Sequence, residues 1–126
     1  MQDDKEAQTR SMLRSEIGEL EKNYRTLRDY VAGTEVYSLE VVGALQAFKD
    51  GLSRISALIL TLYVLKGQKT KITWDPLLVN ISNALENLTS TSHPNPRAAI
   101  QLSFTMSEPN AQEVMVYLSK LKETLR

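Results

Sequence analysis

Between residues 13 and 31, apolar side chains recur at spacings of 4, 3, 4, 3 and 4. This is a heptad repeat, which predicts an α-helix whose apolar stripe takes two positions in every seven. A stripe that narrow suits a single partner helix better than the broad face of a globular core. We therefore expect this helix to form the interface of a homodimer or heterodimer. The stripe, hereafter the seam, consists of Leu13, Ile17, Leu20, Tyr24, Leu27 and Val31.

The seam has an alternative interpretation, in which helix 13–31 folds back on the rest of the chain and completes the core of a monomer. The strict spacing favours the partner helix. The chain has 126 residues, enough for one domain with its own core. We expect residues 1–33 to form a charged N-terminus and coiled-coil stem, and residues 34–126 to form that domain.

The first half of the domain reads as a helix followed by a hairpin. Thr34 is an expected N-cap for a helix from Glu35 to about Lys49, and Asp50-Gly51 is an expected helix end. Residues 55–65 are rich in β-branched and aromatic side chains, which predicts a central strand. Residues 70–74 come after a segment with the composition of a turn, and we predict that they form the returning strand.

The second half reads as helix, strand and helix. Asp75-Pro76 is a typical helix start, and the Pro-rich segment 89–97 predicts a loop. From residue 100 to 107 apolar and polar residues alternate, which predicts a strand with one buried face. Ser107 is the expected cap of a last helix, with Pro109 in its first turn. The fold class is therefore α+β, a two-layer sandwich of helices on a small antiparallel sheet.

The composition excludes several kinds of chemistry. There is no Cys, and His93 is the only histidine. It lies in the 89–97 loop, where an exposed loop histidine is the simplest interpretation. No Ser lies in the nucleophile motif G-x-S-x-G. We expect no enzyme, and no catalytic, cofactor-binding or metal-binding residues. Tyr63 and Trp74 are expected to pack across the hairpin, and the alternative is a ligand platform there.

Charge and hydropathy restrict the partners. Fifteen basic residues balance fifteen acidic ones, which argues against a nucleic-acid partner. The longest apolar run, 55–65, is too short for a membrane helix, which needs roughly 20 residues. We expect no membrane contact within this chain, although an anchor could precede it in a longer protein. A whole protein with this sequence would be cytoplasmic.

The overall pattern resembles the periplasmic part of the inner-membrane assembly-platform proteins of type IV pilus and type II secretion systems. The resemblance covers LRSEIGELEKNYRTLRDYV as the stem, SLEVVGALQAF as the first helix, RISALILTLYVL with TKITW as the hairpin, and IQLSFTMSEPNAQEVMVYLSKL as the closing unit. In that family a membrane helix and a coiled coil precede a ferredoxin-like domain. The resemblance implies a ferredoxin-like fold, a periplasmic location, and a dimeric scaffold that contacts other assembly proteins.

Two functions follow from these observations. The first is a non-enzymatic structural protein that dimerises through its coiled coil and its α+β domain within a larger assembly. The alternative is a cytosolic adaptor or chaperone-like module that binds a client peptide or helix.

Overall fold

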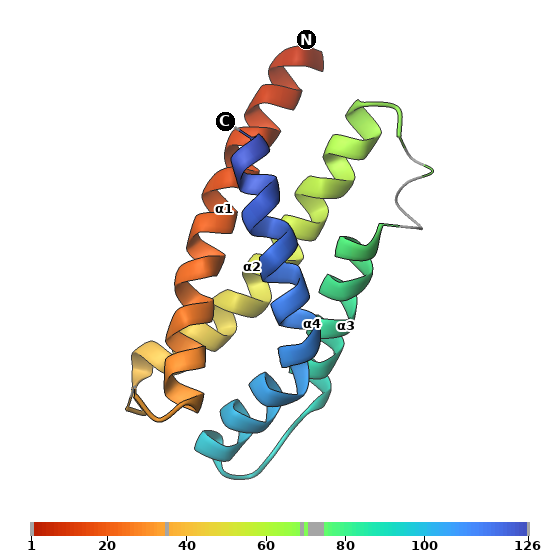
Figure 1. Cartoon of the computed structure of the whole chain (residues 1–126). Coiled ribbons are helices and arrows are strands. Elements are labelled where there is room, and N and C mark those ends of the chain that lie inside the picture. The colour runs from red at the N-terminus through yellow and green to blue at the C-terminus, as the bar shows by residue number, and fades with distance from the viewer. Residues whose placement is uncertain (1, 35, 69, 71–74, 126) are drawn as a thin grey trace.

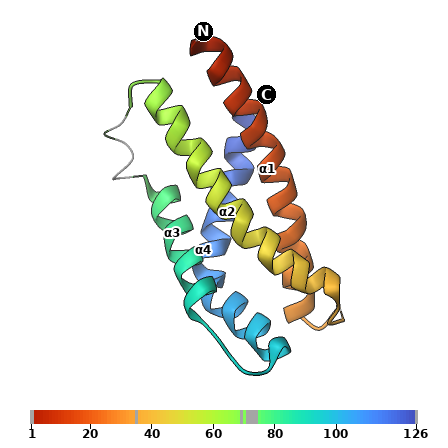
Figure 2. The same cartoon turned by 180° about the vertical axis from the view of Figure 1, so that it is seen from behind.

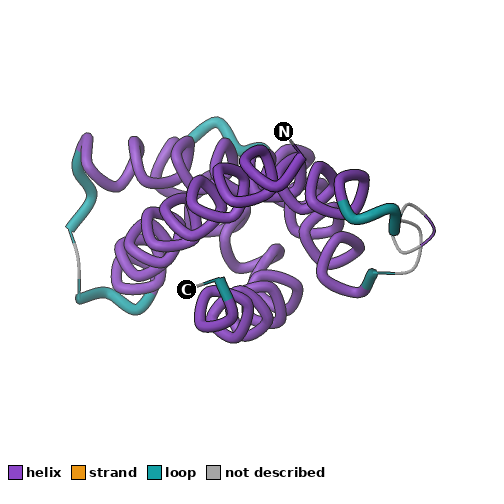
Figure 3. Tube along the Cα trace, turned by 90° about the horizontal axis from the view of Figure 1, so that it is seen from above, coloured by secondary structure: helices purple, strands orange, loops and turns teal. Residues whose placement is uncertain are grey.

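The structure is a computed structural model, and it describes residues 2–34, 36–68, 70 and 75–125. Its elements are four α-helices: α1 (Gln2–Val31), α2 (Leu39–Leu65), α3 (Pro76–Ser90) and α4 (Pro96–Thr124). No strand occurs within the described residues, as the view along the bundle illustrates (Figure 3). The expected α+β sandwich with a ferredoxin-like sheet is therefore wrong, and the fold is a helical bundle.

The four helices run alternately down and up the bundle (Figure 1). Helix α1 packs most extensively against α2, and α3 against α4. Smaller contacts of α1 with α4 and of α2 with α3 close the ring. Helix α4 lies in front in Figure 1 and α2 lies in front in the reverse view of Figure 2, with α1 and α3 on either side. This is the up-down-up-down topology that short connections between helices produce.

Helix α2 begins later and ends later than the sequence pattern predicted. Its N-cap is Ser38, whose side chain accepts a hydrogen bond from the Val41 amide at 3.3 Å, and not Thr34. The helix also continues through Asp50-Gly51, and Gly51 is buried against Leu20 of α1. A Cβ at Gly51 would lie 3.0 Å from the Leu20 Cδ1 atom. This glycine thus provides close helix packing and does not end the helix.

The predicted strand 55–65 is the second half of α2. Ile55, Ile59 and Leu62 are buried at helical spacing. Because most residues in this run are apolar, they fit a period of two and a period of 3.6 equally well. The predicted returning strand 70–74 lies outside the described residues except for Thr70.

Helix α3 confirms the predicted start. The Asp75 carboxylate accepts a hydrogen bond from the Leu77 amide at 2.8 Å, and Pro76 occupies the first helical position. The helix ends at Ser90, so the loop predicted over 89–97 is confined to residues 91–95. The buried face of α3 consists of Leu77, Leu78, Ile81, Ala84 and Leu88.

The predicted strand 100–106 and the helix predicted after it are one continuous helix, α4. Its cap is Asn95, which accepts a hydrogen bond from the Arg97 amide at 2.9 Å. Ser107, the expected cap, is buried within the helix and donates to the Phe104 carbonyl at 2.8 Å. Pro109 lies inside α4, where it removes one helical hydrogen bond. Figure 1 shows α4 changing direction midway.

The core is a single cluster that draws on all four helices. At its centre, the ring of Tyr24 lies 5.9 Å from that of Phe48 and 5.6 Å from that of Phe104, measured between centroids. Such tilted aromatic contacts add to the stabilisation from burial alone. Within the described residues, no helix combines the length and apolarity that crossing a membrane requires.

Candidate functional surfaces

The structure places the seam in the interior of its own chain. Five of its six side chains are buried, and Val31 is partly buried against the same core. Their neighbours are α2 and α4, so these residues have partners without a second chain. Helix α1 is thus one of the four packed helices. An interface between chains through the seam stays a prediction, and the exposed surfaces are the better candidates for contact.

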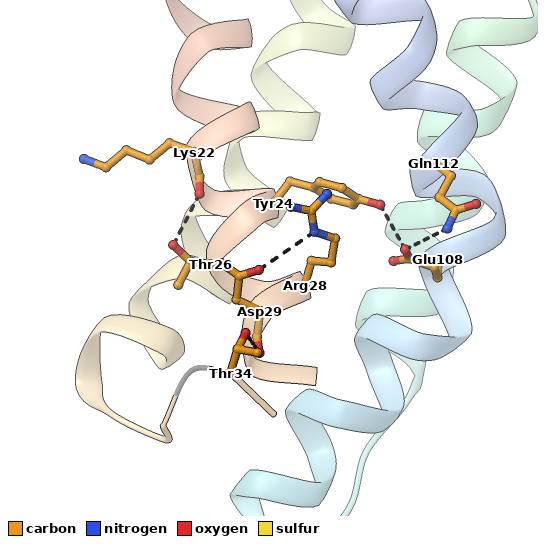
Figure 4. A network of polar contacts seen from close by, with 8 residues as sticks. All are labelled: Lys22, Tyr24, Thr26, Arg28, Asp29, Thr34, Glu108 and Gln112. Carbon is orange, nitrogen blue, oxygen red and sulfur yellow. Dashed lines mark hydrogen bonds and ion pairs between the residues drawn. The ribbon is translucent and has the colours of Figure 1, made fainter. Parts of the chain in front are cut away.

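One seam residue also makes a polar bridge between α1 and α4. The Tyr24 hydroxyl donates to Glu108 Oε1 at 2.9 Å, and Gln112 Nε2 donates to the same oxygen at 3.0 Å (Figure 4). Burial raises the pKa of Tyr24 well above its usual range, and the hydrogen bond to Glu108 raises it further. The other oxygen, Oε2, is buried without a hydrogen-bond partner among the described residues. The bridge runs from the buried Tyr24 through the partly buried Glu108 to the exposed Gln112.

A pocket of about 440 Å³ opens where the N-terminal half of α1 meets the ends of α2 and α4 and the start of α3. This volume falls within the range of small-molecule sites. Six of its lining side chains are aliphatic, and they come from all four helices and the residue that caps α4: Leu13, Ile59, Leu62, Leu77, Leu121 and Leu125.

Polar groups line the rest of this pocket. Arg10 Nη2 donates to the Thr124 carbonyl at 2.9 Å, which ties α1 to the last turn of α4. Lys66 Nζ lies 3.8 Å from Glu6 Oε1, across the open end of the bundle. Arg10 and Lys66 therefore bring two positive charges to the pocket.

The pocket is also lined by an acid held in place by hydrogen bonds, Asp75. The Tyr63 hydroxyl donates to one Asp75 oxygen, and the Leu77 amide donates to the other. Burial raises the pKa of Tyr63 to about 12, with a further contribution from this hydrogen bond. Tyr63 is therefore a neutral donor at physiological pH. Its expected neighbour, Trp74, lies outside the described residues.

A second candidate surface is the outward side of α4. Leu102, Met106, Val116 and Tyr117 are 44%, 56%, 54% and 41% exposed. Pro109, also exposed, lies between them. Spacings of four, three, seven and one place these residues along one face of a helix. We call this set the outer stripe of α4: Leu102, Met106, Pro109, Val116 and Tyr117.

His93 is exposed in the loop before α4, as expected. Its Nδ1 accepts a hydrogen bond from the Asn95 amide at 3.0 Å, so it belongs to the turn that leads into the cap. The part of the chain that the structure describes contains no cluster of three or more metal-ligating side chains.

Sequence reasoning missed both surfaces. Arg10 and Lys66 lie 56 positions apart in the sequence, and only the pairing of α1 with α2 brings them to one pocket. The outer stripe had a readable signal, since Leu102, Met106 and Pro109 follow a spacing of four and three. The assignment of 100–106 to a strand concealed it.

Comparison of the chain with family models, with curated proteins and with solved structures finds no match. The resemblance to pilus and secretion platform proteins therefore rests on the sequence pattern alone. The helices over 55–65 and 100–106 contradict its ferredoxin-like component.

Proposed function

We propose that this chain is a non-enzymatic interaction module that pairs with a second copy of itself through the outer stripe of α4. The exposure of four large apolar side chains along one helix face supports this proposal. Single exposed apolar residues are ordinary on protein surfaces, whereas several on one helix face are typical of an interaction site. The exposed Glu113 lies on the same face, four residues after Pro109 and three before Val116. The contact is placed on α4 because the seam is already buried.

The order of residues in the outer stripe favours a second copy as the partner. Leu102 and Met106 lie eight and four positions before residue 110, and Val116 and Tyr117 lie six and seven positions after it. A twofold axis near residue 110 would therefore pack Leu102 and Met106 of one chain against Val116 and Tyr117 of the partner chain, and the reverse. Such self-complementarity is the requirement for a twofold interface.

The size of the outer stripe sets the expected strength of the pairing. It spans 15 residue steps, or roughly 22 Å of helix. Stable protein interfaces bury about 1,200–2,000 Å² in total, more than one helix face of this length offers alone. We therefore expect a weak dimer that forms with increasing concentration.

The test is the solution mass of the full chain as a function of concentration, measured by sedimentation equilibrium. The chain should shift from monomer to dimer, and Val116→Glu and Met106→Glu should each weaken the association at least about tenfold, because each places a charge in a desolvated contact. Val79→Glu is the matched control, since Val79 is 48% exposed on α3. A chain that is monomeric at every concentration, or a dimer that Val79→Glu weakens as much as Val116→Glu does, contradicts the proposal.

A further inference from the structure

We propose that the pocket at the open end of the bundle binds a small amphipathic monocarboxylate, with its alkyl chain against the aliphatic lining and its carboxylate at Arg10 and Lys66. This site is separate from the contact proposed on α4, so either proposal can fail without the other.

The aliphatic lining provides the surface against which the alkyl chain would pack. Leu13, Ile59, Leu62, Leu77 and Leu125 are each less than a tenth exposed, so their positions are set by the core packing of the bundle. They surround about 440 Å³ of space that opens to solvent. Transfer of an alkyl chain from water into such a pocket is favourable in proportion to the apolar area that it buries.

Arg10 provides hydrogen-bond donors for the carboxylate of the ligand. Its guanidinium carries five N–H donors in a planar fork, and among the described residues it uses one of them, on the Thr124 carbonyl. A carboxylate can accept two parallel hydrogen bonds from such a fork. Lys66 adds a second cation, whose pair with Glu6 joins two partly exposed side chains 3.8 Å apart and contributes little energy by itself.

Nearby acids restrict the negative charge that the pocket can accept. Among the described residues, Arg10 and Lys66 line the pocket with positive charge, Asp75 lines it with negative charge, and Glu6 lies 3.8 Å from Lys66. Both Asp75 oxygens already accept hydrogen bonds, from the Tyr63 hydroxyl and from the Leu77 amide, so this carboxylate is held at the start of α3. With two carboxylates beside these two cations, a monoanion fits the pocket better than a dianion.

The test compares octanoate with octan-1-ol, two probes with the same chain length that differ in head group. Each is titrated into the full-length protein while backbone amide NMR signals are followed. We expect saturable shifts centred on Leu13, Leu62 and Leu125. We also expect an affinity for octanoate about tenfold higher than for octanol, because only the carboxylate can accept charge-assisted hydrogen bonds from Arg10.

Two substitutions distinguish the contribution of the ligand's carboxylate from that of its alkyl chain. Arg10→Gln should weaken octanoate binding about tenfold and leave octanol binding unchanged. Arg14→Gln is the matched control, because Arg14 is exposed one turn further along α1 and does not line the pocket. Leu121→Trp should abolish binding of both probes, since Leu121 is partly exposed and the larger ring would occupy the pocket.

Three results would overturn the proposal. One is the absence of saturable shifts with octanoate. Another is octanol binding as tightly as octanoate. The last is an octanoate affinity that Arg10→Gln and Arg14→Gln reduce equally. If Arg10→Gln lowers the thermal stability of the chain through loss of the Thr124 contact, Lys66→Gln provides the same comparison, with an expected loss of a few-fold in octanoate affinity alone.

Discussion

Individual polar side chains connect helices that share few other contacts. The bridge from Tyr24 to Glu108 joins α1 to the middle of α4, and the pair of Lys122 with Glu21 at 2.8 Å joins the same two helices nearer the C-terminus. The second pair is accessible to solvent and therefore contributes little. The Tyr24–Glu108 bridge matters more, because Glu108 Oε2 is buried without a hydrogen-bond partner among the described residues, while Oε1 accepts from Tyr24 and Gln112.

Tyr24→Phe should therefore destabilise the chain by about 1–3 kcal/mol, the usual cost of removing one partner of a buried polar group. The phenyl ring keeps the contacts with Phe48 and Phe104, so the change reports on the hydroxyl. Tyr30→Phe is the control: its ring lies 6.2 Å from that of Tyr37, and its expected effect is below about 0.5 kcal/mol. The measurement is urea denaturation followed by circular dichroism. Equal effects of the two substitutions would show that the Glu108 bridge contributes no net stability.

At the scale of the elements, α4 contains the most unusual sequence for a helix. Ser103 and Ser107 occupy buried positions and donate their hydroxyl hydrogens back to the Ala99 and Phe104 carbonyls. Pro109 follows two residues later on the exposed side. Such side-chain hydrogen bonds and an internal proline both bend helices. The change of direction in α4 therefore has a local cause in its sequence.

Pro109→Ala should stabilise the chain by about 1–2 kcal/mol. An internal proline costs roughly 3 kcal/mol in a helix, and part of that gain is offset because alanine gives the unfolded chain more freedom. Pro76→Ala is the matched control, since Pro76 occupies the first turn of α3, where no helical hydrogen bond is lost; we expect no gain there. Thermal unfolding of the two variants gives the comparison. A loss of stability in Pro109→Ala would show that the bundle requires the bent form of α4.

The same elements explain which parts of the fold the sequence could predict. The seam helix and the start of α3 were predictable as secondary structure, because a heptad repeat indicates a helix and an Asp-Pro pair indicates a helix start. The spacing of the seam left open whether its partner was another chain or the same chain. Residues 100–107 were not, because the buried serines hide the helical spacing of Ile100 and Phe104 and leave an apparent alternation. Residues 55–65 failed for the opposite reason, since a nearly continuous apolar run fits either period. The pocket required tertiary pairing that no local pattern encodes.

For the whole molecule, the position of the seam decides whether α1 is a separate stem or an integral helix. Leu20 is 1% exposed, and its Cδ1 atom would lie 3.0 Å from a Cβ at Gly51 of α2. A carboxylate at this position would be buried without a partner. Leu20→Asp should therefore destabilise the entire chain by more than about 4 kcal/mol, the size that burial of an unpaired charge produces.

Lys22→Asp is the control for this substitution, because Lys22 is exposed on the same helix and also acquires a carboxylate. Urea denaturation and sedimentation of the full chain distinguish the two arrangements. With an integral α1, Leu20→Asp unfolds the chain in one cooperative step and Lys22→Asp leaves the midpoint nearly unchanged. A Leu20→Asp variant that stays folded and loses only its association would show that the seam is an interface between chains. The packing of Leu20 against Gly51 favours the first outcome, because the missing Cβ lets α1 and α2 approach closely at that point.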